Sequence, residues 1–218
     1  MDRLKQIRRS RQWTKETLHL LDLSQAYTYA QIPQHFWNKK LEGIKDPESV
    51  KKIQKYARNI DKCLTEKHLG LFLYGQHGVG KSFLAAYIAM YAIRKDFSAW
   101  FYDGEQFKQD LFKAMKDQDT KRKLNRIMRK ADLLILDNMT IKRESDGKAQ
   151  PFIQEQLEIL LRRRQNVGAL IITSAGNNAS LIFEGVVQSL LEEMTYTIRV
   201  GGSDLRKQVS TTKFAELD

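Results

Sequence analysis

The sequence is short of the features that mark secreted or membrane-bound proteins. Cys63 is its only cysteine, which excludes a disulfide framework. Prolines are few, three among 218 residues, and no tract is of low complexity. The longest apolar runs, at 133–136 and 169–172, are far shorter than the roughly 20 residues that cross a bilayer. The basic first residues have no apolar segment behind them, so a secretory signal is not expected. These absences predict a cytoplasmic protein.

Acidic residues are also in deficit. The chain has 26 Asp and Glu against 37 Lys and Arg, a formal net charge of +11, and a pI near 9.6. Residues 1–68 carry 15 basic and 8 acidic side chains, so the first third of the chain holds most of the excess. Hydrophobic residues make up 42%, enough to build a core and to exclude a disordered chain. The charge predicts a polyanionic partner.

A helix is predicted over residues 4–23, ahead of the folded core. Trp13, Leu18 and Leu21 fall near one face of this helix, and its first turns are rich in arginine and lysine. Two interpretations stay open: the arginines bind nucleic acid, or the apolar face docks on a partner protein. We therefore treat residues 1–30 as a helical N-terminal extension.

From residue 69 onward, short apolar strands alternate with helices. Because the strands are apolar on both faces, this alternation predicts a parallel sheet covered by helices on both sides. Residues 31–218 are expected to form one α/β domain, with a helical insertion around 105–130. The predicted strands cover residues 69–74, 99–102, 133–137, 169–173 and 195–200, and the predicted helices cover 50–64, 81–94, 105–115, 120–130, 152–164 and 186–194.

Residues 75–82 read Gly-Gln-His-Gly-Val-Gly-Lys-Ser and fit the P-loop pattern in full. Such a loop turns its backbone N–H groups toward phosphate oxygens, and the helix that follows adds its positive N-terminal end. We expect Lys81 to reach the β- and γ-phosphates of ATP and Ser82 to contact Mg²⁺. The alternative, a glycine-rich turn without a ligand, is disfavoured by the apolar strand before it and the apolar helix after it. The predicted nucleotide contacts are Gly75, Gln76, His77, Gly78, Val79, Gly80, Lys81, Ser82 and Phe83.

The strand at 133–137 ends in Asp137, as the Walker B strand of P-loop ATPases does. We expect Asp137 to hold Mg²⁺; the alternative is that it only caps a turn. Asn138 follows where such ATPases usually carry an acid that polarises the attacking water. An amide orients water but does not take its proton. Hydrolysis is therefore predicted to be slow or conditional, unless Glu144 or Asp146 substitutes.

The strand at 169–173 is expected between the P-loop strand and the Walker B strand. Thr173, Ser174 or Asn177 at its end would contact the γ-phosphate or the attacking water, or would only cap the turn. We select Ser174 as the nucleotide contact among them.

A run of basic residues lies at 121–130, with no acid among them. On a helix these cations face away from an apolar side, an arrangement that suits a groove along a phosphate backbone. A solvated helix surface is the alternative. We predict DNA contacts from Lys121, Arg122, Arg126 and Arg129. The run at 162–164 is expected to be solvated or to lie at an interface.

Together, these motifs resemble the AAA+ ATPases of the DnaC/DnaI helicase-loader group, and the transposition helper IstB is similar. The resemblance spans roughly residues 30–213 and rests on IPQHFWNKKLEGI, LFLYGQHGVGKSFLAAYIA, ADLLILDN, ALIITSAGN and GGSDLRK. It implies a sheet of order 5-1-4-3-2, ATP bound at subunit interfaces, and ATP-dependent assembly around single-stranded DNA. It also implies that Arg206 approaches the nucleotide, and that a replicative hexameric helicase is the partner.

Three positions depart from that family's pattern. Asn138 stands in place of an acid, Ala175 in place of an asparagine, and Glu193 where many members carry an arginine. These departures predict intact ATP binding with weak turnover. The predicted function is an ATP-binding helicase loader that assembles on single-stranded DNA and delivers the helicase during replication initiation. The alternatives are an IstB-like helper that binds duplex DNA and stimulates a transposase, and a small-molecule kinase, for which no arginine-rich lid is evident.

Overall fold

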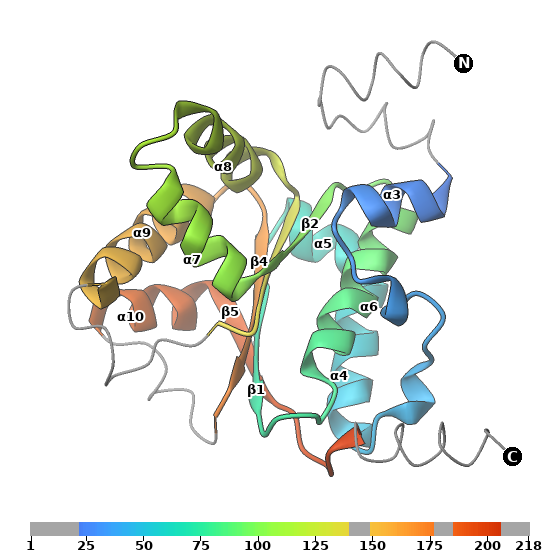
Figure 1. The fold of residues 1–218 in the computed structure, drawn as a ribbon. Coiled ribbons are helices and arrows are strands. Elements are labelled where there is room, and N and C mark those ends of the chain that lie inside the picture. Colours follow the sequence, from blue (N-terminus) through green and yellow to red (C-terminus); the bar gives the residue numbers. More distant parts are fainter. Residues whose placement is uncertain (1–21, 140–148, 177–184, 206–218) are drawn as a thin grey trace, which may run out of the picture.

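The computed structural model describes residues 22–139, 149–176 and 185–205 (Figure 1). Nearly all of the helix predicted over 4–23 lies outside the described residues. Within the described ranges, no helix combines the length and the apolar character that a membrane crossing needs.

Five parallel strands form one sheet in the order β2-β3-β4-β1-β5. This is the predicted order 5-1-4-3-2 read from the other edge, and it places β4 between β1 and β3, as expected. Strands β1 to β4 are apolar because both faces of the sheet are covered, whereas the edge strand β5 is exposed at three of its five positions. Their bounds are β1 Gly70–Gly75, β2 Ala99–Asp103, β3 Leu133–Asp137, β4 Ala169–Ala175 and β5 Thr195–Arg199.

Helices cover both faces of the sheet, as Figure 1 shows. On one face lie α3 Leu23–Tyr29, α4 Pro47–Arg58, α5 Ile60–Thr65 and α6 Lys81–Arg94, with the 3-10 turns Gln34–Phe36 and Leu41–Gly43 beside them. On the other face lie α7 Gly104–Lys113, α8 Gln118–Lys130, α9 Ala149–Arg164 and α10 Gly185–Met194.

Alternate residues of β1, β2, β3 and β4 enter alternate cores. Ile171 of β4 packs with the α6 face, whereas Ile172 packs with the α7–α10 face. Ile135 of β3 and Phe101 of β2 also belong to the α6 face. A residue two positions further along the same strand points to the same face. The alternation therefore determines to which face the polar residues near the strand ends point.

The N-terminal elements differ from prediction in two respects. The helix predicted over 50–64 is two helices, α4 and α5, separated at Asn59. It also begins earlier, because Asp46 caps Pro47–Arg58 by accepting the backbone N–H of Ser49 at 3.1 Å. Helix α3 packs in the α6-side core, and the carbonyl of Ala30 accepts the N–H of Phe101 on the edge strand β2. Residues 23–30 are therefore continuous with the packing of the domain.

Arg164 corrects a further prediction, because it is fully buried rather than solvated or interfacial. Its guanidinium donates hydrogen bonds of 2.9 Å to the carbonyls of Met128, Ala131 and Ala169. These carbonyls belong to the C-terminal end of α8 and to the segments that enter β3 and β4. Burial lowers the pKa of Arg164 to about 10, and the nearby charge of Asp132 opposes that shift.

Candidate nucleotide-binding site

The P-loop connects β1 to α6 at the carboxyl edge of the sheet. Gly78 and Gly80 have φ angles of 77° and 102°, in the left-handed region that residues with a side chain rarely adopt. Gly80 is the N-cap of α6, and the helix begins at Lys81 and runs for 14 residues. These glycine conformations and a helix that starts directly after the loop are what an anion-binding nest requires.

Lys81 is buried at the base of this loop, with 8% of its surface exposed. Its Nζ donates hydrogen bonds to the carbonyls of Gly75 at 2.8 Å and of Gln76 at 2.6 Å. The ammonium group is therefore held by the loop it belongs to, so phosphate oxygens would bind an already oriented donor.

The other predicted nucleotide contacts divide by exposure. The side chains of Val79 and Phe83 are buried, and Phe83 packs on Phe36 with ring centroids 6.0 Å apart. These two residues offer a phosphate only their backbone N–H groups. Gln76 and His77, in contrast, are exposed.

Asp137, at the end of β3, accepts hydrogen bonds from two other elements. The Thr173 hydroxyl of β4 donates to Asp137 Oδ1 at 2.5 Å, and the Ser82 hydroxyl of α6 also bonds to the carboxylate. Burial raises the pKa of Asp137, and the negative charge of Asp103 adds to the rise. The hydrogen bonds from Thr173 and Ser82 and the charge of Lys81 act in the opposite direction. Ser82 and Asp137, both predicted to bind Mg²⁺, are thus brought together. Their oxygens are the ligands that this ion prefers.

The backbone conformation at position 138 favours asparagine, which the sequence alone does not reveal. Asn138 has a φ of 56°, in the left-handed region where asparagine is favoured over most other residues. Its backbone N–H donates to Thr173 Oγ1 at 2.9 Å, and the residue is exposed. An asparagine here lets the chain turn directly after the Walker B strand.

Of the residues considered at the end of β4, Thr173 is the one that contacts Asp137. Ser174, which we selected from the sequence, is fully buried, and its hydroxyl donates to the carbonyl of Met139 at 2.5 Å. Ile172, two residues before it, belongs to the α7–α10 core, so Ser174 faces away from α6. Asn177 lies outside the described residues, as do Glu144, Asp146 and Arg206.

A segment after β5 packs against the outer side of the P-loop. The backbone N–H of Leu205 donates to the carbonyl of Gly78 at 3.0 Å, and a Cβ on Gly78 would lie 1.8 Å from Asp204 Oδ1. The carboxylate of Asp46 holds the same segment by accepting the N–H of Gly201 at 2.7 Å. The loop is therefore buttressed by residues more than a hundred positions away.

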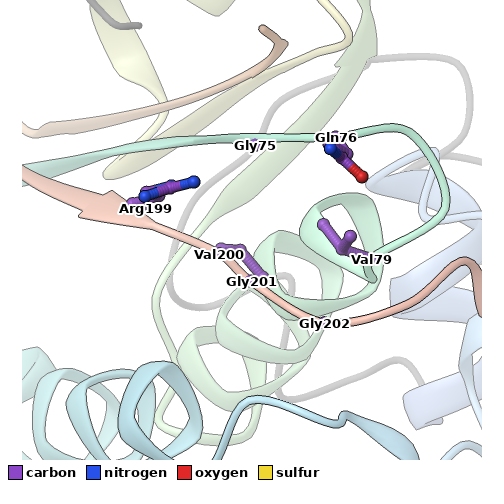
Figure 2. A pocket seen from close by; sticks show the side chains of 7 residues that line it. All are labelled: Gly75, Gln76, Val79, Arg199, Val200, Gly201 and Gly202. Atoms are coloured by element: carbon purple, nitrogen blue, oxygen red, sulfur yellow. The ribbon is translucent and has the colours of Figure 1, made fainter. Parts of the chain in front are cut away.

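A small cavity of about 140 Å³ lies between the P-loop and the end of β5, and Figure 2 shows the residues that line it. It is smaller than the roughly 300 Å³ at which sites for drug-sized ligands begin. The cavity is therefore an addition to the phosphate-binding loop and not an alternative binding site for the nucleotide. Its lining residues are Gly75, Gln76, Val79, Arg199, Val200, Gly201 and Gly202.

Sequence reasoning overlooked Arg199, Asp204 and Asp103, three charged residues at this end of the sheet. For Asp103 a signal existed, because Phe-Tyr-Asp closes β2 as Ile-Leu-Asp closes β3. Arg199 and Asp204 carry no catalytic motif, so the predicted pairing of the last strand with the P-loop strand did not by itself single them out.

The predicted DNA-binding residues lie on α8, on the α7–α10 side of the sheet (Figure 1). As predicted, Leu124, Ile127 and Met128 form its buried side. Arg122 and Arg129 are exposed, whereas Arg126 is half-buried and its shielded Nη2 has no hydrogen-bond partner among the described residues. Lys121 is exposed as well.

A five-stranded parallel sheet in this order, with a complete P-loop after β1 and an acid at the end of β3, is the fold of P-loop proteins of the AAA+ class. The chain belongs to the family of IstB-like ATP binding proteins, whose pattern it matches over residues 23–195. Family and fold confirm the resemblance that the motifs predict.

Individual relatives come from DNA replication. A stretch of 75 residues is 36% identical to the replicative helicase loader DnaI of Bacillus subtilis. That stretch is 34% of this chain and 24% of the loader, so the chain spans about a quarter of the length of that curated relative.

Solved structures extend the likeness to most of the chain. The DnaC helicase loader has a TM-score of 0.64 at 20% identity, covering 78% of this chain and 100% of that chain. DnaI has a TM-score of 0.58 at 20% identity, covering 80% and 94%. The replication initiator DnaA, bound to AMPPCP and single-stranded DNA, has a TM-score of 0.61 at 16% identity, covering 85% and 56%. At these identities the likeness establishes the fold.

Proposed function

We propose that the protein is an ATP-dependent helicase loader. It binds ATP and Mg²⁺, assembles on single-stranded DNA, and delivers a replicative hexameric helicase during replication initiation. The observation that carries this proposal is the sequence match to the loader DnaI, which joins an intact P-loop in the same chain. Such a protein would act in the cytoplasm.

ATP would bind through the backbone of residues 75–83 and the ammonium of Lys81. Mg²⁺ would be held by Ser82 and Asp137, where it neutralises phosphate charge. Thr173 orients the Asp137 carboxylate through their hydrogen bond. The sequence selects Ser174 and Arg206 for the same site. Because the Ser174 hydroxyl bonds to the carbonyl of Met139, an indirect role fits this serine better: it shapes the turn after β3.

Single-stranded DNA would follow the exposed cations of α8. Lys121, Arg122 and Arg129 project into solvent, and Arg126 lies half-buried beside them. Arg122 lies 3.6 Å from Asp119, but both side chains are largely exposed, so this pair opposes phosphate binding little.

Assembly into an ATP-bridged oligomer would complete the nucleotide site from a neighbouring subunit. The N-terminal extension would dock on the helicase. Hydrolysis would be slow or would depend on DNA, since Asn138 is exposed and carries no acid.

A second candidate function is that of an IstB-like transposition helper, which binds duplex DNA and stimulates a transposase. The family match itself favours this candidate, because the family takes its name from such a protein. The two candidates differ in the form of DNA they prefer.

Fluorescence anisotropy separates the two candidates. Labelled single-stranded and duplex DNA are titrated with ATP, ADP or no nucleotide, while oligomer size is followed by light scattering. Tight binding to single strands that needs ATP and accompanies assembly is expected for the loader. Duplex preference would favour the transposition helper. An absence of DNA binding in every nucleotide state would contradict both.

A further inference from the structure

Three adjacent strands carry oxygen-bearing side chains near their carboxyl ends, on the α6 face of the sheet. Thr173 of β4, Asp137 of β3 and Asp103 of β2 each lie two residues beyond a side chain of the α6-side core, namely Ile171, Ile135 and Phe101. Because side chains alternate along a strand, all three point to the side on which the P-loop and α6 lie. Asp103 is therefore a second carboxylate on the same face of the sheet, one strand away from the Walker B residue Asp137.

Asp103 and Asp137 are direct neighbours across β2 and β3. They are register partners in the parallel pair, and adjacent strands lie about 4.8 Å apart. The junction that follows is closely packed, since a Cβ on Gly104 would lie 2.8 Å from the carbonyl oxygen of Asp137. The Asp103 side chain is therefore held at the end of β3, beside the turn formed by Asn138.

The structure also fixes how the Asp103 carboxylate is oriented. Its Oδ1 accepts the backbone N–H groups of Glu105 at 3.0 Å and Gln106 at 3.1 Å, as the N-cap of α7. Within the described part of the chain, Oδ2 makes no hydrogen bond, and the residue is exposed. One oxygen is anchored and the other faces solvent at the edge of the site.

We propose that Asp103 supplies the carboxylate that Asn138 lacks in ATP hydrolysis. The oxygen of a water molecule forms a bond to the γ-phosphorus, the bond from that phosphorus to the β–γ bridging oxygen breaks, and the water's proton passes to Asp103 Oδ2. The products are ADP and inorganic phosphate. This role rests on the proposed binding of ATP at the P-loop, and it places the acid one strand away from its expected position.

The test is Asp103→Asn, which keeps the cap on α7, because asparagine caps helices as well as aspartate does. Glu105→Gln is the matched control, since it removes the same charge two residues away from an exposed position. ATP affinity is measured with a fluorescent analogue, and single-turnover hydrolysis is measured with and without single-stranded DNA. We expect Asp103→Asn to retain ATP affinity within about twofold. Its rate of ATP hydrolysis should fall about 100-fold, which is the lower end of the range for loss of a general base. The control keeps both.

Rescue completes the design. In Asp103→Asn/Asn138→Asp the acid returns to the position after Asp137, where aspartate also tolerates a positive φ. Hydrolysis should recover at least tenfold over the single variant. A double variant no faster than Asp103→Asn overturns the proposal.

The remaining outcomes are distinguishable. Unchanged hydrolysis in Asp103→Asn, or a rate that falls only in step with ATP affinity, overturns the role of Asp103 and leaves ATP binding standing. A wild-type protein that binds ATP without hydrolysing it in either DNA condition does the same. If the wild-type protein does not bind ATP, the proposed function itself fails.

Discussion

Thr173 Oγ1 stands between two strands, donating to Asp137 Oδ1 at 2.5 Å and accepting the backbone N–H of Asn138 at 2.9 Å. One hydroxyl therefore orients the Walker B carboxylate and ties down the turn that follows it. Thr173 is only 1% exposed, so water does not readily replace its hydroxyl as a hydrogen-bond partner.

Thr173→Val should lower the free energy of unfolding by about 1–3 kcal/mol, because the partly buried N–H of Asn138 and the Asp137 carboxylate both lose a hydrogen-bond partner. Thr173→Ser keeps the hydroxyl and should lose about 1 kcal/mol or less. Urea unfolding of the nucleotide-free protein measures both. A valine variant as stable as the serine variant would show that the hydroxyl matters little.

Asp137→Asn is expected to stabilise the nucleotide-free protein at neutral pH. Burial raises the pKa of Asp137, so the folded state binds its proton more tightly than the unfolded state does. Stability from this group is therefore present below the unfolded pKa and is lost as pH rises through the folded pKa. The variant has no such group, so its melting temperature should exceed that of the wild type at pH 7–8, and the gap should close as pH falls toward 4. A gap that stays constant with pH would contradict this.

Lys81→Met should abolish stabilisation by ATP. In the wild type, ATP at about 100 times its Kd raises stability by about 2.7 kcal/mol, which is a shift of several degrees for a chain of this size. The variant removes the ammonium but keeps an unbranched side chain in its buried place. Thermal unfolding with and without ATP and Mg²⁺ gives the shift directly. A full shift in the variant would overturn the P-loop assignment.

Much of the fold could be predicted because each strand is a short apolar run with a clear boundary. The helix at 81–94 was predicted to the residue, since a P-loop defines its start. The break at Asn59 was missed, because α4 and α5 keep one amphipathic pattern across it. Arg164 was misplaced for another reason: its partners are backbone carbonyls, which no residue letter encodes.

The candidate site divides in the same way. Lys81, Ser82 and Asp137 could be identified because local motifs carry them. The choice between Thr173 and Ser174 depends on which face of β4 each occupies, and that follows only from the register with β3. The neighbours of Asp137 and Gly78 come from distant segments, so pairing and packing, rather than composition, bring them to the site.

The α8 cations should control how DNA binding depends on salt. Replacing Arg122, Arg126 and Arg129 with Ala should weaken binding to single-stranded DNA. It should also reduce the slope of log affinity against log salt by about 2, at about 0.7 per lost phosphate contact. The matched control removes three exposed cations from α4, on the other side of the sheet: Lys51, Lys55 and Arg58. Anisotropy titrations at several salt concentrations measure both slopes. Equal slopes in the two triple variants would show that the α8 cations form an ordinary solvated surface and do not contact DNA.

Arg164 should be among the most sensitive positions for stability, although it lies at the end of the sheet away from the P-loop. Arg164→Met removes hydrogen bonds to three buried backbone carbonyls, and we expect a loss of at least about 3 kcal/mol in the free energy of unfolding. Arg164→Lys should also be destabilising, because a single ammonium cannot match the fork of a guanidinium that reaches Met128, Ala131 and Ala169 together. Arg163→Lys, an exposed neighbour, should change stability by less than about 0.5 kcal/mol. Denaturant unfolding of the three variants tests this, and a lysine at 164 that matches the wild type would mean that charge alone, not the fork, holds α8 to β3 and β4.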